Sequence, residues 1–450
     1  MKLKFPPLYF QGALGLFLCM AVAYFWIKAG LFHTGFLGED FAYLRYNIHS
    51  PKPWLWSMVH PNEFGQFRPL GHQLYFVVTK WLFQLNPTPY HVLQLTIHLA
   101  NTLLVFFLLR LLSPNTLKNS RYTTIISALC AFLWAIQANH AKAIFWVSAT
   151  NNLLYSFFGL IFFCLLLKKN SAIVLQLFIL TLALASKEFA VLLPVLAFFL
   201  LTACTDFYKK KIYSLLPHFS LVAFYLIYRL FFHASFADNF SPQFNTRSEL
   251  AALTYLSWGF QFLEPMAPFA AILFLLLAFF QKTARGFLFF PIFILFLSLW
   301  PDHVMPEFLY LGSLGIIVAI HAMLVKKLAR PILWITILSL LLFLFYITPK
   351  EFSFAQNTQK YLQKRSEIYT RTHEQLELIP TMLENKKFWK NLNQDLGAEI
   401  AHIPWYVDLY WPERFPCLTD NFRKSFSSLG AKDAVTTLTP SLFQCASSSK

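Results

Sequence analysis

The sequence predicts an all-α polytopic membrane protein with about eleven transmembrane helices. Hydrophobic residues make up 57% of the 450 residues and charged residues only 13%, whereas soluble domains carry about 25% charged residues. The apolar residues fall into runs long enough to cross ~30 Å of hydrocarbon, and the runs lack the alternation of barrel strands. Only helices and closed barrels satisfy the backbone in lipid, so these runs predict helices.

Each apolar run is interpreted as one span. The eleven spans are expected at residues 8–29, 90–112, 122–139, 144–167, 171–186, 189–205, 212–232, 267–281, 286–300, 309–325 and 331–348. No small-residue cleavage site follows the first run, so it is expected to remain as a signal anchor. The amphipathic segment 250–264 is interpreted as a helix lying at the membrane surface.

Basic residues collect in every second connection. They are Lys2, Lys4, Lys118, Arg121, Lys168, Lys169, Lys209, Lys210, Lys211, Lys282, Arg285, Lys326, Lys327 and Arg330. The positive-inside rule therefore predicts a cytoplasmic N-terminus, and an odd number of spans places the C-terminus outside the cytoplasm. Orientation also accounts for the net charge of +16, so no nucleic-acid partner is expected. The short tail and the lack of a retention signal favour a bacterial inner membrane.

Two regions are expected along the chain. Residues 1–348 form the transmembrane domain, including a structured outer loop at 30–90 with a juxtamembrane helix near 68–86; loops of that length usually have structure or function. Residues 349–450 form a small extracytoplasmic region, helical at 353–379. Whether Cys417 and Cys445 pair there is left open.

Polar residues concentrate on the predicted outer side. The connections there contain Glu39, Asp40, Arg68, His140, Lys142, Lys187, Glu188, Asp302 and Glu307, and Arg229 lies near the outer end of its span. Hydrocarbon cannot solvate such groups, and ionisable residues at a membrane are a sign of function. A site assembled between helices is therefore expected on this face.

Several short motifs occur in a particular order. They are Gly38-Glu39-Asp40-Phe41, Phe67-Arg68-Pro69-Leu70, Tyr90–His98, Trp146-Val147-Ser148, Ser186-Lys187-Glu188 with Pro194, and Phe308–Ser313. Their order over about residues 8–325 resembles type C (GT-C) membrane glycosyltransferases, in the branch related to dolichyl-phosphate-mannose:protein mannosyltransferases. The resemblance implies inverting transfer of a sugar from a polyprenyl-phosphate donor to a protein, lipid or glycan acceptor, at the outer face and among membrane lipids.

Four positions depart from this resemblance. Glu307 stands where the family usually has arginine, Lys142 where an acidic residue is common, Asn152 where aspartate is common, and Gln94 in place of an asparagine. These departures keep open a non-catalytic homologue that binds a glycolipid. A transporter or lipid flippase is a further alternative, although it predicts Gly-broken spans in both halves and the chain has only 14 Gly.

The reaction that the resemblance implies assigns catalytic roles to the acidic pair. A carboxylate must take the proton of the acceptor hydroxyl, and Asp40 is the expected base. Glu39 is expected to orient Asp40, to bind the acceptor, or to help hold Mg²⁺ or Mn²⁺, although no cofactor is required. No dedicated metal site is expected.

Cations are expected to hold the anionic lipid phosphate. Lys187, Arg68 and Arg229 are the candidates, with His140, Glu188 and Tyr310 as further substrate-binding residues. The alternatives are a salt bridge between Lys187 and Glu188, anchoring of the arginines at the bilayer, and a structural or aromatic-belt role for His140 and Tyr310. The sugar, the acceptor and the lipid carrier are left open.

Overall fold

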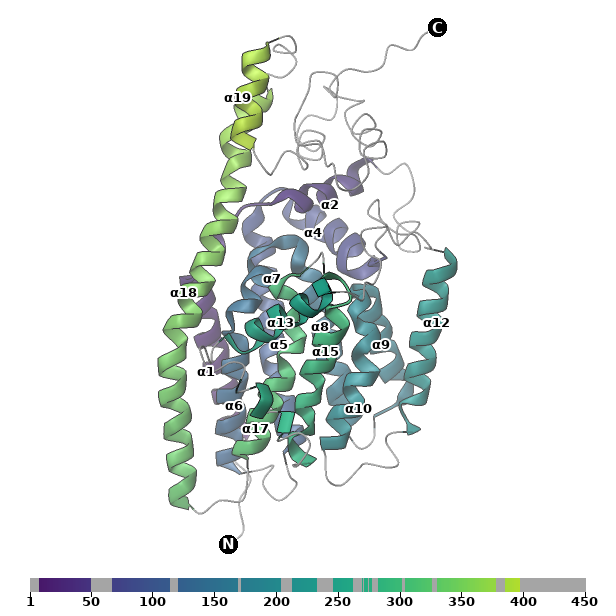
Figure 1. Ribbon diagram of the computed structural model, residues 1–450, viewed down its shortest axis with the longest axis vertical. Helices are drawn as coiled ribbons and strands as arrows, with labels where there is room; N and C mark the ends of the chain where they lie inside the picture. The colour runs from purple at the N-terminus through teal and green to yellow at the C-terminus, as the bar shows by residue number, and fades with distance from the viewer. Residues whose placement is uncertain are drawn as a thin grey trace.

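The computed structural model describes residues 8–49, 67–113, 120–168, 171–203, 213–232, 246–261, 269, 271–273, 275–276, 282–301, 304–325, 330–377 and 385–396. Every regular element within these ranges is helical (Figure 1), which confirms the all-α prediction. The described part contains five helices long and apolar enough to cross a membrane, or six if one bent pair is a single span. A multi-pass membrane protein is compatible with these helices, whereas the number eleven stays a prediction.

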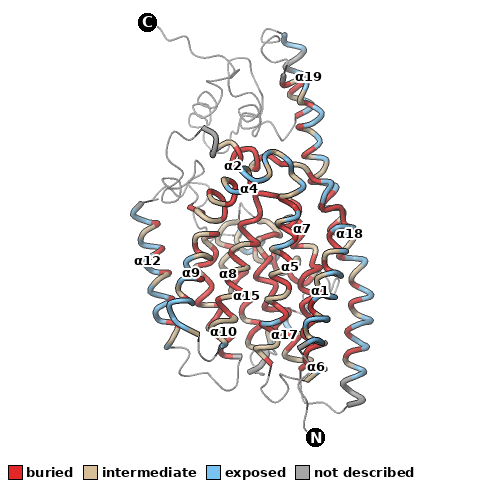
Figure 2. Tube along the Cα trace, turned by 180° about the vertical axis from the view of Figure 1, so that it is seen from behind, coloured by how far each residue is buried: buried red, intermediate tan, exposed pale blue. Residues whose placement is uncertain are grey.

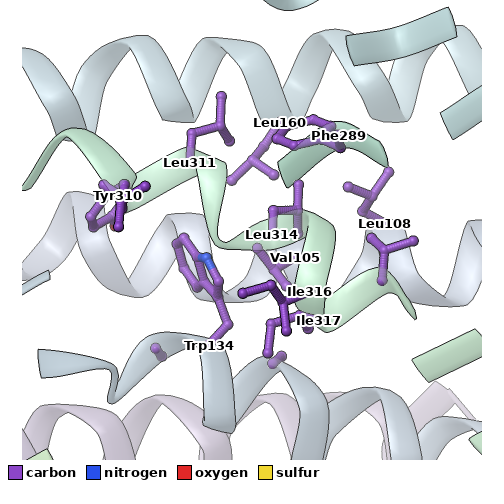
Figure 3. Packing of buried hydrophobic residues seen from close by; sticks show 14 of the residues in the cluster. Val105, Leu108, Trp134, Leu160, Phe289, Tyr310, Leu311, Leu314, Ile316 and Ile317 are labelled. Carbon is purple, nitrogen blue, oxygen red and sulfur yellow. The ribbon is translucent and has the colours of Figure 1, made fainter. Parts of the chain in front are cut away.

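The long central helices form a bundle. They are α1 (Leu8–Lys28), α5 (Pro87–Leu112), α6 (Arg121–Ala135), α8 (Thr150–Leu167) and α17 (Leu314–Leu324). Helix α5 packs against both α6 and α8, and α17 packs against α6. Figure 3 shows the packing, in which Val105 of α5, Trp134 of α6, Leu160 of α8 and Leu314 of α17 are all fully buried. This dense interior fixes the ends of the helices relative to one another.

Shorter apolar helices extend the bundle on one side. They are α9 (Ile173–Ser186), α10 (Leu193–Ala203), α12 (Leu216–Phe232) and α15 (Phe289–Leu297). Helix α9 packs against α8, and α12 packs against α9. The outward faces of α12 and α18 are exposed and apolar (Figure 2), with Phe231 and Phe345 each 81% exposed. Such surfaces suit contact with lipid tails.

Helix α18 (Arg330–Glu377) is longer than expected. It has 48 residues, which gives a length of about 72 Å, more than twice the hydrocarbon thickness. The predicted last span and the predicted helix at 353–379 are therefore one helix, which continues through Pro349 and across the 348/349 boundary. Its upper half packs on the loop that precedes α2 and on α2 itself: Gly35 N–H donates to Ser366 Oγ (3.2 Å), and the Phe41 and Tyr369 rings lie 4.6 Å apart. A short helix, α19 (Lys386–Leu396), packs against α18.

Three short elements cover one end of the bundle, drawn at the top of Figure 1 and called the upper end below. They are α2 (Gly38–His49), the π-helix η2 (Pro69–Leu74) and α4 (Tyr75–Phe83). Most of the segment 68–86 is therefore helical, but the helix is split between η2 and α4 and ends at Phe83, before Gln84 with its positive φ of 51°. Its juxtamembrane position stays a prediction. Trp81 on α4 is 80% exposed.

Gly71 explains the close seating of η2. A Cβ atom at this position would lie 2.1 Å from the carbonyl oxygen of Ser186, the last residue of α9. Any side chain here would overlap that backbone, so only glycine lets η2 lie on the end of α9. The contact brings the start of η2 next to the residues that follow α9.

The helices near the upper end are interrupted by short turns. Helix α6 is followed by η3 (Ala138–His140) and α7 (Ala141–Phe145), with a bend of 53°, and then by η4 (Val147–Ala149). Lys187 separates α9 from η5 (Glu188–Leu192), and η10 (Pro306–Phe308) with α16 (Leu309–Gly312) precedes α17. These turns replace straight spans with irregular backbone, which is where polar side chains can gather.

Some expectations fall on other parts of the chain. Helix α13 (Thr246–Gly259) forms where an interfacial helix was expected and packs against α15, which follows the 3₁₀ segment η8 (Lys282–Leu288). Most of the predicted span 267–281 lies outside the described residues, as do Asp302, Cys417 and Cys445.

Candidate functional site

Asp40 lies at the start of α2, and its carboxylate is completely engaged. Oδ2 accepts a hydrogen bond from Leu37 N–H (2.8 Å), while Oδ1 accepts from Ser148 N–H (2.7 Å) and from the Ser148 hydroxyl. The first bond is one half of a capping box, because Leu37 is the residue before the helix. Asp40 is fully buried, and burial raises its pKa to about 7 although the Ser148 hydroxyl and the two N–H groups oppose the rise. Asp40 thus ties α2 to the η4 turn.

Glu39 precedes Asp40 but differs from it in burial and in hydrogen bonding. Its side chain is half-buried, and it makes no hydrogen bond or ion pair with any residue that the structure describes. Burial raises the pKa of Glu39, against the opposing charges of Lys142, Arg68 and Arg365. Of the two neighbouring carboxylates, Glu39 is the one that accepts no hydrogen bond from the described residues.

Arg68 and Glu188 form a two-point ion pair between η2 and η5. Arg68 Nε donates to Glu188 Oε2 (2.7 Å), and Nη2 donates to Oε1 (2.5 Å). The two side chains are 10% and 24% exposed. Both carboxylate oxygens are therefore used, in the geometry that guanidinium and carboxylate groups favour.

Lys187 is buried beside this pair, with only 1% of its surface exposed. Its Nζ donates to Asn152 Oδ1 and lies 4.5 Å and 4.3 Å from the ring centroids of Phe189 and Phe308. No carboxylate of the described residues lies within 4 Å, so the expected alternative of a salt bridge with Glu188 is not formed. Burial and the neighbouring Arg68 charge lower the pKa of Lys187 well below its ordinary value.

Lys142 and Glu307 form a second ion pair, between α7 and η10. Lys142 Nζ lies 3.0 Å from Glu307 Oε1 and 4.7 Å from the centroid of the Trp146 ring. Both positions depart from the family resemblance, and the structure joins them as a complementary pair of charges. Glu307 is 1% exposed, and its Oε2 has no hydrogen-bond partner in the part of the chain that the structure describes.

Residues that the sequence did not single out support the acidic pair. Asn151 Nδ2 donates to His72 Nε2 (2.6 Å), and the His72 ring lies 4.2 Å from the Tyr43 ring of α2. Together with Ser148, these residues join α2, η2 and the start of α8. The Trp146-Val147-Ser148 motif is the signal that could have identified Ser148 as the partner of Asp40.

His140 and Tyr310 belong to a different polar cluster, inside the bundle. Their rings lie 4.5 Å apart, and His140 Nε2 lies 3.3 Å from Ser313 Oγ. The Tyr310 hydroxyl is hydrogen-bonded to His98 Nδ1 (2.6 Å) and Asn101 Nδ2 (3.2 Å). Both candidates are fully buried, and their contacts join helices rather than line the cluster around Lys187.

Arg229 lies near the first ion pair. It is 8% exposed, its Nη1 lies 3.4 Å from the hydroxyl oxygen of Tyr225, and its charge acts on Glu188. Of the expected site residues, Glu39, Asp40, Arg68, Lys187, Glu188 and Arg229 therefore occupy the upper end together.

The described residues contain no group of three or more His, Cys, Asp or Glu side chains that could hold a metal ion. Asp40 has no oxygen without a hydrogen bond. The Mg²⁺ or Mn²⁺ ion considered at Glu39 and Asp40 stays a prediction.

Comparison with known proteins gives no match: no family model, curated protein or solved structure matches this chain. The resemblance to membrane glycosyltransferases therefore rests on the ordered motifs alone.

Proposed function

We propose that this protein is an inverting membrane glycosyltransferase that moves a sugar from a polyprenyl phosphate to an acceptor at the upper end of the bundle. One observation carries the proposal. Among the described residues, Glu39 has no cation within 4 Å and Lys187 has no carboxylate within 4 Å, and both are influenced by the charges of Arg68, Lys142 and Glu307. This transfer needs one group that takes a proton and one that receives an anion.

The phosphate of the donor is assigned to Lys187. An ammonium group buried among Phe189, Phe308 and Asn152 is costly without a counter-ion, and a lipid phosphate would provide one. Arg68 adds positive charge beside it, although its hydrogen bonds to Glu188 keep it in place. The lipid phosphate is an anionic leaving group and needs no proton from an acid.

Glu39 is assigned as the base that takes the proton of the acceptor hydroxyl. The sequence had suggested Asp40 for this role and Glu39 as the residue that orients it. The acceptor oxygen forms a bond to the anomeric carbon while the bond from that carbon to the phosphate oxygen breaks. The electron pair of the broken bond stays on the phosphate, and the acceptor proton moves to the Glu39 carboxylate. Asp40 acts as a positioning residue, because three donors already occupy its oxygens.

The pairing of Lys142 with Glu307 weakens the case for a non-catalytic homologue. That alternative depends on altered positions, and two of them compensate each other's charge. The finer architecture belongs to the same proposal: a GT-C-like fold with about eleven spans, a cytoplasmic N-terminus and a bacterial inner-membrane location.

The test uses the full chain in nanodiscs with polyprenyl-phosphate glucose, mannose or galactose as donor and a mixture of membrane proteins, glycolipids and glycans as acceptor. Wild-type protein should release polyprenyl phosphate, and Glu39→Gln should lower the rate by about 100-fold or more while donor binding is retained. Lys187→Met should abolish donor binding. Glu249→Gln, at an exposed position of α13, is the matched control. Movement of a fluorescent lipid across the bilayer without sugar release would support a flippase instead.

A further inference from the structure

The Lys142–Glu307 pair leaves polar atoms unused. Oε2 of Glu307 is buried without a donor, and the indole N–H of Trp146 has no acceptor among the described residues. Lys142 Nζ contacts Glu307 Oε1 (3.0 Å) and Met305 Sδ (3.5 Å). These contacts use two of its three N–H groups and leave the third available to a ligand. The Lys142 side chain is 18% exposed. One buried acceptor, Glu307 Oε2, and two N–H donors, the Trp146 indole N–H and the third N–H of Lys142, thus have no partner among the described residues.

This group of residues lies near both ends of the proposed reaction. The charges of Lys142 and Glu307 act on Glu39 and also on Lys187. Because Lys187 is assigned to the phosphate and Glu39 to the acceptor proton, the transferred group must be close to both. Lys142, Trp146 and Glu307 come from α7, from the break after it and from η10, so three separate segments supply the same small region.

The unused atoms suit hydroxyl groups. A carboxylate oxygen accepts a hydrogen bond from a hydroxyl group, and an ammonium or indole N–H donates one. The charges of Lys142 and Glu307 cancel each other. A sugar acid or an amino sugar would therefore find no unpaired opposite charge in this region. Selectivity of this kind arises because a mismatched ligand leaves a buried polar group unpaired.

We propose that Lys142, Trp146 and Glu307 bind the transferred sugar and restrict it to an uncharged pyranose. This inference rests on the proposed function. Glu307 Oε2 accepts a hydrogen bond from one sugar hydroxyl, Lys142 and Trp146 donate to others, and the indole ring packs against the sugar.

The experiment compares three donors with the same lipid: polyprenyl-phosphate glucose, glucuronic acid and glucosamine. Wild-type protein should prefer glucose. Glu307→Gln leaves Lys142 unpaired and should shift the binding ratio toward glucuronic acid by about 10-fold. Lys142→Met leaves Glu307 unpaired and should shift the ratio toward glucosamine. The reversed pair, Lys142→Glu with Glu307→Lys, should restore the preference for glucose.

A structural ion pair predicts a different result. If Lys142 and Glu307 only join α7 to η10, both single variants lower the melting temperature and leave the donor ratios unchanged, which overturns the inference while the transferase stands. Wild-type protein that binds none of these three donors and neither the mannose nor the galactose donor overturns the proposed function and the inference with it. Trp146→Phe adds a milder test: it keeps the ring, removes the N–H, and should raise KM for the glucose donor with kcat unchanged.

Discussion

Two ion pairs lie at the upper end of the bundle, and they differ in how completely their polar atoms are used. In the Arg68–Glu188 pair both carboxylate oxygens accept hydrogen bonds from the guanidinium group. In the Lys142–Glu307 pair one carboxylate oxygen, Oε2, has no partner among the described residues. The same contrast separates Asp40, with three donors, from its neighbour Glu39. Saturated groups hold the segments of this site together, whereas unsaturated groups are available to a ligand.

The largest loss of stability is expected at Gly71, which lets η2 lie on the end of α9 and so positions the Arg68–Glu188 pair. Gly71→Ala places a methyl group 2.1 Å from the Ser186 carbonyl oxygen, so η2 must move and Arg68 must leave Glu188. Destabilisation by about 3 kcal/mol or more is expected for such overpacking, measured as a lower melting temperature in detergent. Gly12→Ala is the control, because nothing lies within 4 Å of its added atom. Equal melting temperatures for both variants would contradict the close seating of η2.

Breaking the two ion pairs compares them directly. Glu188→Gln leaves the buried Arg68 charge without a carboxylate and should destabilise the protein by about 3 kcal/mol. Glu307→Gln should cost less than half as much, because its ion pair has a single contact and Lys142 is partly exposed. Thermal unfolding of the two variants under identical conditions provides the measurement. The opposite ranking would show that the second pair is the structural one.

The same contrast predicts different defects at the two neighbouring acids. Asp40→Asn replaces one acceptor oxygen by an NH₂ group, so that Leu37 N–H or Ser148 loses its acceptor. This should destabilise the protein by about 1–2 kcal/mol. Glu39→Gln should leave the melting temperature within about 1 °C of wild type, because no described residue bonds to Glu39, while sugar transfer is lost. Ser148→Ala should behave like Asp40→Asn. A large loss of stability in Glu39→Gln would remove the distinction between the two carboxylates.

The sequence predicted the helices and the positions of the charges better than it predicted their partners. Hydropathy locates α1 and α5 well, because a span of the bilayer requires a run of apolar residues. Glu188 was a candidate substrate-binding residue, with a salt bridge to Lys187 as the alternative, but it pairs with Arg68, 120 positions earlier. That choice depends on Gly71 letting η2 reach the end of α9, and no local pattern encodes such a contact.

The length of helix α18 was also not predictable from the sequence. A change from apolar to polar composition near residue 349 predicted two elements, whereas the helix continues because its polar half packs on η1 (Leu31–His33), η3 and α7. This half carries a buried stripe that includes Ala355, Leu362 and Tyr369. Tertiary packing decides helix length where intrinsic preference does not. The Asp40–Ser148 contact, across 108 positions, follows from the same kind of packing.

The smallest expected effect is a change of stability with pH, and it should differ between variants of Asp40 and of Glu39. The pKa of Asp40 is about 7 in the folded protein, against 3.8 for a free side chain. Between these values the folded protein holds a proton that the unfolded chain releases, so stability falls as the pH rises from about 4 to about 7. Wild-type melting temperature should decrease over this range, and Asp40→Asn should show a flatter curve. Glu39→Gln should keep most of the slope, because Glu39 is less buried than Asp40. Glu351 is also buried and its pKa is about 7, so part of the slope should remain in Asp40→Asn. A slope that survives in full would mean that Asp40 does not titrate over this range and is ionised when it holds Ser148.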